Sequence, residues 1–274
     1  MLRTVLAGTL ALAVAALLLR SLPAAAEEQP EGVRTALALA AELPQPSAAL
    51  GFTFFAQGER RDKDGKTVLA AVELALRVEP LTEGGWTGWK TTETWTAKTP
   101  QATSRRMVEA VFAPDLTPIR GSTFEEGTQV PTQLEWLGGE KALALQLKTK
   151  DQRVLRSAWY AGQPVVEVGG AVLLARLLPR DFKRCQLDFC APSWNKVGTE
   201  PQRFFGIALA GGTGPQIRIQ EQNTPEVQTI ETVSVQGYRD EQTLIFSILL
   251  NKETGLPIMV MINGVTYAGQ VTPL

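Results

Sequence analysis

The 274-residue chain contains no histidine. This absence excludes Ser-His-Asp and Cys-His catalysis, and it removes the side chain that most often binds zinc or iron. Cysteine is scarce as well, with two residues in the whole chain. Neither sign of charge is in excess, because 27 Lys and Arg residues face 28 Asp and Glu residues. Without a basic surface, the composition gives no reason to expect nucleic-acid binding or a polybasic membrane contact.

Residues 1–26 have the pattern of a secretory signal peptide. Arg3 precedes an apolar run over residues 5–19, and three alanines supply small residues for cleavage after Ala26. A retained membrane anchor is the alternative, but the run is shorter than the roughly 20 residues of a spanning helix and ends at Arg20. We therefore expect a periplasmic or secreted protein without a membrane span after cleavage.

Beyond the signal, the pattern is mainly that of β-strands. Every second residue from Val68 to Val78 is apolar, which predicts a strand with one wholly apolar face. Asp64-Gly65 and Asn263-Gly264 are hairpin signals. We predict strands over residues 50–60, 67–79, 86–98, 105–113, 119–126, 132–137, 141–149, 153–160, 216–220, 227–238, 242–251, 256–262 and 265–270.

One short helix is predicted inside this β pattern, over Ala171–Leu178. Gly169-Gly170 opens it and Pro179 ends it, because proline disfavours helix in the residue before it. Arg176 is the one charged position of the eight, so most of the helix surface has to be covered. We therefore predict a mainly β fold in which a strongly curved antiparallel sheet, a half-barrel, wraps this helix.

The predicted organisation has three parts. Residues 27–48 form an N-terminal helix and linker, with the helix over residues 31–43. Residues 49–274 form a single β domain with an irregular insert near 192–212. Two β subdomains joined near residue 192 are the alternative.

Cys185 and Cys190 lie five positions apart. In an exported chain this proximity favours a local disulfide. A redox pair is the less favoured alternative, since such pairs usually have two residues between the cysteines.

The remaining polar motifs indicate no chemistry. The glycine-rich loop at 211–214 is followed by Pro215 and a strand, whereas a phosphate-binding loop is followed by a helix. Glu125-Glu126 and Asp240-Glu241 are interpreted as solvated surface. We accordingly predict no catalytic residue, no metal site and no cofactor.

The tryptophans are more informative. Trp89 and Trp95 share one face of their strand with Thr91 and Glu93. An ordinary aromatic core is one interpretation, and the lining of an apolar cleft is the other. The residues predicted to line such a cleft are Trp89, Trp95, Trp136, Leu174 and Leu177.

Two stretches resemble a known family. They are VVEVGGAVLLARLL at 165–178 and LLNKETGLPIMVMINGVTYAG at 249–269. In this order the chain resembles exported bacterial proteins of the DUF3108 type, which are similar to the LolA/LolB-like lipoprotein-carrier architecture. The resemblance implies a carrier fold and carries over no catalytic residue.

These observations favour a non-catalytic periplasmic carrier or chaperone that binds a lipid or another apolar ligand in the curved sheet. One alternative is a structural or assembly factor of the cell envelope that acts through a protein partner. A second alternative is a histidine-free hydrolase that uses a carboxylate pair.

Overall fold

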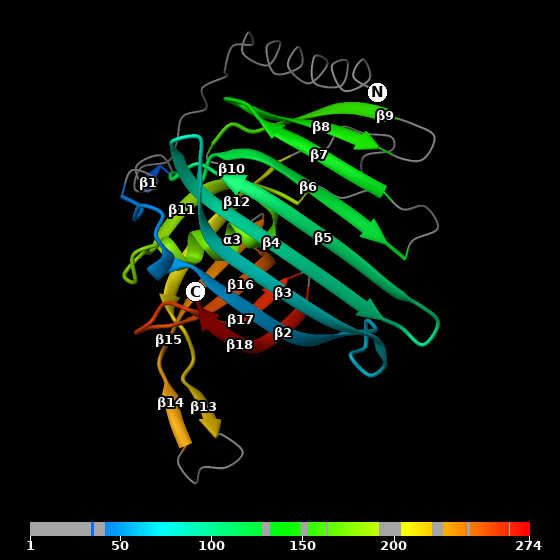
Figure 1. Cartoon of the computed structure of the whole chain (residues 1–274). Helices are drawn as coiled ribbons and strands as arrows, with labels where there is room; N and C mark the ends of the chain where they lie inside the picture. The colour runs from blue at the N-terminus through cyan, green and yellow to red at the C-terminus, as the bar shows by residue number, and fades with distance from the viewer. Residues whose placement is uncertain are drawn as a thin grey trace.

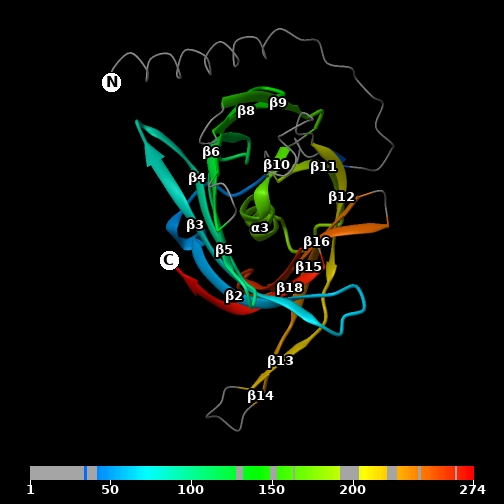
Figure 2. The same ribbon diagram turned by 90° about the vertical axis from the view of Figure 1, so that its right-hand side faces the viewer.

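The computed structural model of the chain describes residues 34–35, 42–127, 132–148, 153–162, 164–191, 204–220, 227–239, 242–262 and 264–274. Sixteen strands form one large sheet that curves around the helix α3 (Glu167–Leu177), as Figures 1 and 2 show. Two further strands, β13 (Ile217–Gln220) and β14 (Val227–Ile230), form a separate ribbon that projects from the body. The predicted mainly β fold with a curved sheet around one short apolar helix is therefore confirmed.

The first half of the sheet is an antiparallel meander in which neighbours in sequence are neighbours in space. Its strands are β2 (Phe52–Arg61), β3 (Val68–Glu83), β4 (Trp86–Lys98), β5 (Thr103–Phe112), β6 (Pro118–Glu126), β7 (Thr132–Gly138), β8 (Ala142–Lys148) and β9 (Arg153–Trp159). The turn before β3 uses the predicted Asp-Gly pair, and Gly65 adopts a φ of 68° that favours glycine. A short 3₁₀ helix, Ala48–Leu50, precedes β2.

The second half continues the same sheet. Its strands are β11 (Arg184–Cys190), β12 (Phe205–Thr213), β15 (Thr232–Arg239), β16 (Thr243–Asn251), β17 (Pro257–Ile262) and β18 (Val265–Pro273). β1 (Arg34–Thr35) and β10 (Pro164–Val166) pair in parallel with β11. Pairing of β18 with β2 joins the two halves. Among the described residues β9 and β11 do not pair, so the sheet is not closed into a barrel.

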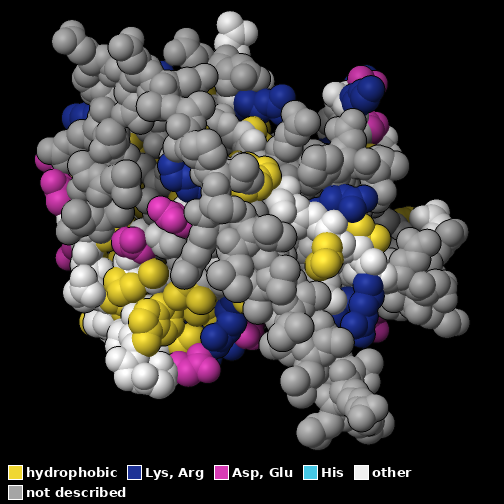
Figure 3. All heavy atoms as spheres, turned by 90° about the horizontal axis from the view of Figure 1, so that it is seen from above, with side chains coloured by type: hydrophobic (Ala, Val, Ile, Leu, Met, Phe, Trp, Pro, Cys, Tyr) yellow, Lys and Arg dark blue, Asp and Glu magenta, His cyan; other side chains and the backbone are white. Residues whose placement is uncertain are grey.

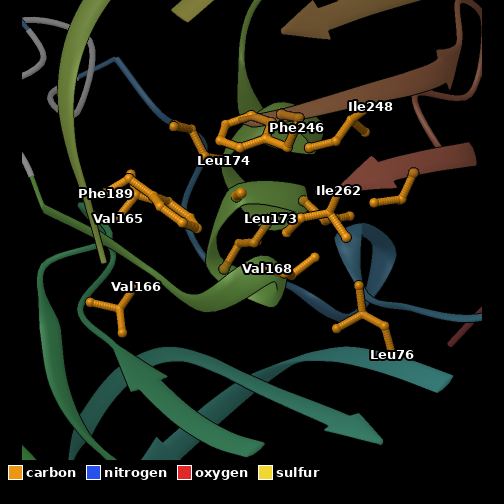
Figure 4. Packing of buried hydrophobic residues seen from close by; sticks show 14 of the residues in the cluster. Leu76, Val165, Val166, Val168, Leu173, Leu174, Phe189, Phe246, Ile248 and Ile262 are labelled. Carbon is orange, nitrogen blue, oxygen red and sulfur yellow. The ribbon is translucent and has the colours of Figure 1, made fainter. Parts of the chain in front are cut away.

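Most of the concave face of the sheet is apolar, apart from buried polar residues on β4 and β6. On β3, Ala70, Val72, Leu74, Leu76 and Val78 are buried, as their alternation predicts. The helix supplies the opposite side of the core, and ten of its eleven residues are buried. Figure 4 shows its side chains Val168, Leu173 and Leu174 among those of sheet residues such as Phe246 and Ile262. Seen from above, the surface carries a hydrophobic patch together with side chains of both charge signs (Figure 3).

The helix begins four residues earlier than predicted, at Glu167, and includes both glycines. Gly169 is required inside the helix by close packing against β4. A Cβ there would lie 2.8 Å from the Glu93 Oε1 atom and 2.9 Å from the Thr91 side chain. The two glycines therefore allow the first turn of the helix to approach the sheet.

Two predictions about irregular or helical segments are wrong where the structure describes them. Arg34–Thr35, inside the predicted helix 31–43, forms strand β1, since these two residues pair with β11. The predicted insert at 192–212 ends in strand β12, which pairs with both β11 and β15. Residues 1–33, 36–41, 192–203 and 240–241 lie outside the described residues, so the signal peptide, most of the predicted helix and the pair Asp240-Glu241 lie there.

The predicted disulfide is also wrong. Cys185 and Cys190 lie on the same extended strand, β11, and are not joined. Five residues along a strand span roughly 16 Å, and an odd separation directs the two side chains to opposite faces. A disulfide requires Cα atoms roughly 4.4–6.8 Å apart. Both side chains are buried, and burial raises the pKa of the Cys185 thiol to about 12.

Candidate functional site

A cavity of about 400 Å³ lies beside the first turn of α3 on the concave side of the sheet. Its walls come from strands β2 to β6 on one side and from β17 and β18 on the other. The apolar and aromatic lining residues are Val72, Trp95, Ala97, Val168, Ala191, Ile262, Val265 and Tyr267. The charged lining residues are Arg60, Glu73, Arg105, Arg106, Glu125, Glu126 and Glu167.

The antiparallel register assembles one wall of this cavity. Trp95 on β4 lies opposite Arg106 on β5, and Arg106 lies opposite Glu125 on β6. The three residues therefore form one row across three adjacent strands. The Trp95 ring also meets the Tyr267 ring of β18 edge to face, with centroids 5.2 Å apart. This contact links the two walls of the cavity.

Glu93 lies two residues before Trp95 on the same face of β4, and its side chain is fully buried. Its Oε1 atom accepts a hydrogen bond from the backbone N–H of Gly169 at 2.6 Å, and its Oε2 atom accepts one from the Trp95 indole at 2.9 Å. The first N–H groups of a helix have no partner within the helix. No side chain at the N-cap of α3 supplies one, so Glu93 caps the helix from the sheet.

Glu167 is the first residue of α3 and is likewise fully buried. The Nη2 atom of Arg106 donates to both of its carboxylate oxygens, at 2.7 and 2.9 Å. The Thr123 hydroxyl lies 3.5 Å from its Oε1 atom. Its backbone has a φ of 63°, a left-handed conformation that residues other than glycine adopt rarely, at a cost of roughly 1–3 kcal/mol. Strain and a buried charge at a cavity wall are marks of a functional position.

Arg106 stands between the carboxylates. Besides Glu167, it contacts Glu125, with 3.6 Å between its Nε atom and the Glu125 Oε1 atom. Burial by itself lowers the pKa of Arg106, but the charges of Glu167, Glu93 and Glu125 raise it above its ordinary value. The guanidinium therefore stays charged and serves three acidic groups at once.

The pKa values of the three carboxyl groups are raised, because burial favours their uncharged form. Burial raises the pKa of Glu167 to about 7; the charge of Glu93 adds to the rise and Arg106 opposes it. Burial also raises the pKa of Glu93 and that of Glu125, in both cases against the attraction of Arg106. One guanidinium does not fully stabilise three carboxylates that are removed from water. The cluster therefore takes up a proton near neutral pH.

Of the five residues predicted to line a cleft, Trp95 lines this cavity. The other four, Trp89, Trp136, Leu174 and Leu177, belong to the packed core, and neither Trp89 nor Trp136 is more than 1 % exposed. The Trp136 ring lies where a Cβ at position 121 would be, against Gly121. These four are therefore packing residues at the positions where a cleft was predicted.

Sequence reasoning missed the charged residues of the site, namely Glu93, Arg106, Glu125 and Glu167. Glu125 was interpreted as solvated surface, yet 20 % of its side chain is exposed and it lines the cavity. The available signal was Glu93, a carboxylate on a strand face that otherwise carries tryptophan and threonine. A charged group at such a position needs a partner, and the partner turns out to be distant in sequence.

Within the part of the chain that the structure describes, no three His, Cys, Asp or Glu side chains gather as a metal site. Nor does a described helix have the length and apolar character to cross a membrane. The described lining of the site consists of carboxylates, the guanidinium groups of Arg60, Arg105 and Arg106, aromatic rings and small or aliphatic side chains.

Comparison with known proteins identifies the fold and no activity. No family model and no curated protein matches the chain. A solved structure does match: a β-barrel-like protein of domain of unknown function DUF1849 from Brucella abortus. The alignment covers 84% of this chain and 97% of that one, with 9% identity and a TM-score of 0.50. A β-barrel-like architecture is supported, whereas the resemblance to DUF3108 and LolA/LolB-like carriers stays a prediction.

Proposed function

We propose that the chain is a non-catalytic periplasmic carrier or chaperone that binds a lipid or another apolar small molecule in this cavity. The observation that carries the proposal is the cavity itself, whose aromatic and aliphatic walls adjoin a set of charged side chains. Small-molecule sites are typically concave and mostly apolar in this way. The periplasmic location rests on the signal-peptide pattern of residues 1–26.

The size of the cavity restricts the ligand. Ligand sites usually occupy roughly 300–1,000 Å³, and about 400 Å³ lies near the lower limit of that range. We therefore expect one small molecule or a single acyl chain to bind.

The experiment has two parts. Protein purified from its own envelope is examined by native mass spectrometry and then extracted for lipid, and a bound apolar molecule is expected. Separately, the neutral fluorescent probe N-phenyl-1-naphthylamine is titrated into the parent, into Ala97→Trp and into Leu155→Trp. Ala97 lines the cavity, whereas Leu155 is 46% exposed on β9.

Ala97→Trp should weaken probe binding at least about tenfold, since the larger ring fills the cavity, and Leu155→Trp should bind as the parent does. Circular dichroism and urea unfolding establish that each variant is folded. Equal probe binding by all three proteins, together with no co-purified ligand, would contradict the proposal. That outcome would favour a structural or assembly factor that docks an envelope partner.

A second candidate function follows from one further observation. Glu125 and Glu167 both line the cavity and both contact Arg106, so two carboxyl groups face one space. Glycoside hydrolases use two carboxyl groups roughly 5–10 Å apart, one of which has a raised pKa and acts as the acid. Release of p-nitrophenol from a panel of p-nitrophenyl glycosides by the parent, lost in Glu167→Gln, would establish this function. No release from any glycoside would remove it.

A further inference from the structure

Among the described residues, acidic groups outnumber basic ones at the charged end of the cavity. Three carboxyl groups, from Glu93, Glu125 and Glu167, act on the single guanidinium of Arg106. These four residues come from three adjacent strands and the helix, so the imbalance belongs to the packed interior. Burying a carboxylate without a compensating positive charge costs free energy. Binding a proton or a second cation reduces that cost.

The other charges around the cavity are closer to balance. Glu73 pairs with Lys98 at 2.8 Å, and Arg105 lies opposite Glu126 across β5 and β6. Arg60 lies near enough to Tyr267 to lower the pKa of that phenol, against a larger rise caused by burial. Within the part of the chain that the structure describes, the excess of acidic over basic groups is therefore greatest in the cluster around Arg106.

The aromatic wall adjoins this cluster. Trp95 lines the cavity, contacts Tyr267 and donates its indole N–H to Glu93. Aromatic faces attract cations, and their rings also accept an apolar chain. A ligand that lies along the faces of Trp95 and Tyr267 with its charged group foremost would bring that group toward Glu125 and Glu167.

We propose that the cavity selects a ligand with a cationic group, such as a primary amine, on a compact apolar body. The inference rests on the proposed binding function and names the chemical class of its ligand. The ammonium group donates to the carboxylate of Glu125 and lies beside the Arg106–Glu167 pair, while the apolar body lies against Val72, Val265 and Tyr267.

Binding of such a cation is coupled to the release of a proton. The unliganded cluster holds a proton because burial raises the pKa of Glu167 to about 7. An ammonium ion stabilises the ionised carboxylate and displaces that proton. For one linked proton, affinity should rise about tenfold between pH 6 and pH 8. Arg106, which stays charged, and the carboxyl groups of Glu93 and Glu125 are the charged groups around Glu167 that influence this titration.

The test uses three ten-carbon probes that differ in head group: decylamine, decanol and decanoate. Each is titrated below its micelle concentration into the full chain by calorimetry at pH 6, 7 and 8. Buffers of different ionisation enthalpy reveal proton release. At pH 8 decylamine should bind at least about tenfold more tightly than decanol, and its affinity should fall toward pH 6 while that of decanol does not.

Two variants locate the effect. Glu167→Gln should abolish the preference for decylamine and its pH dependence while decanol binding persists. Glu125→Gln, at a less buried position, should reduce the preference and serves if Glu167→Gln fails to fold. The matched control is Glu79→Gln, which removes a carboxylate that pairs with Arg77 and does not line the cavity.

The possible outcomes separate the two proposals. Decanol or decanoate binding as tightly as decylamine would overturn the cationic ligand and leave apolar binding in place. Decylamine preference that Glu167→Gln and Glu125→Gln both retain would also overturn it. No binding of any of the three probes would overturn the cationic ligand together with the proposed function.

Discussion

The pH dependence of stability gives the sharpest test of the buried cluster, because its sign is opposite to that of an ordinary ion pair. Glu167 titrates near its ordinary value of 4.5 in the unfolded chain, whereas burial raises its pKa to about 7 in the folded chain. Between these values the folded state binds more protons than the unfolded state. Stability is therefore greatest below the unfolded pKa and is lost as pH rises through the folded one.

The magnitude follows from the size of the shift. One pKa unit corresponds to about 1.4 kcal/mol, so raising the pKa from 4.5 to about 7 removes roughly 3 kcal/mol of unfolding free energy between pH 4.5 and pH 8. Glu93 changes stability in the same direction, since burial also raises its pKa. Because the two groups are neighbours, the measured loss belongs to the pair.

The perturbation that isolates this contribution is Glu167→Gln. Unfolding free energies are measured by urea titration at half-unit steps from pH 4.5 to pH 8.5. The unfolding free energy of the parent should fall across this range, and that of Glu167→Gln should fall less. Relative to the variant, the parent should therefore lose roughly 3 kcal/mol of unfolding free energy between low and high pH. Glu253→Gln, in the exposed turn after β16, is the control and should follow the parent within about 0.5 kcal/mol. Parallel curves for the parent and Glu167→Gln would refute this account of the cluster.

Three further predictions concern the core and the cysteines. Leu174→Asp should lower the unfolding free energy by more than about 3 kcal/mol in urea titration, since it places a charge in the packed core. Arg176→Ala should lower it by about 1 kcal/mol or less. Equal urea midpoints for the parent and both variants would show that the helix is not central to the core. Gly169→Ala, which favours an ordinary helix, should instead lower the melting temperature, because the added methyl group meets β4 at 2.8–2.9 Å; a raised melting temperature contradicts this. Denatured, unreduced protein should show labelled thiols at both Cys185 and Cys190, and the same assay on folded protein should show neither reacting quickly.

The strands were predictable where alternation and turn residues agree. The strand predicted over 86–98 has the same bounds as β4, because glycines precede it and its Thr and Trp residues favour extended structure. The helix was predicted from its apolar composition and from Pro179. Its true start was not, because two glycines ordinarily indicate a break, and only the contact with Glu93 makes them part of the helix.

The region around the cysteines shows how one signal obscured another. Cys185, Leu187 and Phe189 are buried while the residues between them are less so, which is the alternation of a strand. Interpreting the two cysteines as a disulfide required a tight loop in the same place. The local alternation indicates a strand, whereas the expected disulfide rested on the exported compartment and the proximity of the two cysteines.

The site itself was not predictable from the sequence because its residues meet through register. Arg106 comes beside Trp95 and Glu125 by the pairing of β4, β5 and β6, and it reaches Glu167 across 61 positions of sequence. A one-residue slip in any of these pairings would send the side chain to the other face of the sheet. No local sequence motif indicates which residues the strand register will bring together.

The cluster divides into a part that the fold needs and a part that faces the cavity. Glu93 satisfies the helix N-terminus through Gly169 and does not line the cavity, so its burial is explained by capping alone. Glu167 and Glu125 line the cavity and cap nothing in the helix. A purely structural cluster would need one carboxylate to balance Arg106, and Glu167 already pairs with that guanidinium at 2.7 Å. The left-handed backbone of Glu167 adds a cost of roughly 1–3 kcal/mol. Glu125 is the carboxylate in excess of this balance, and together with Glu167 it lines the cavity in which the proposed ligand would bind.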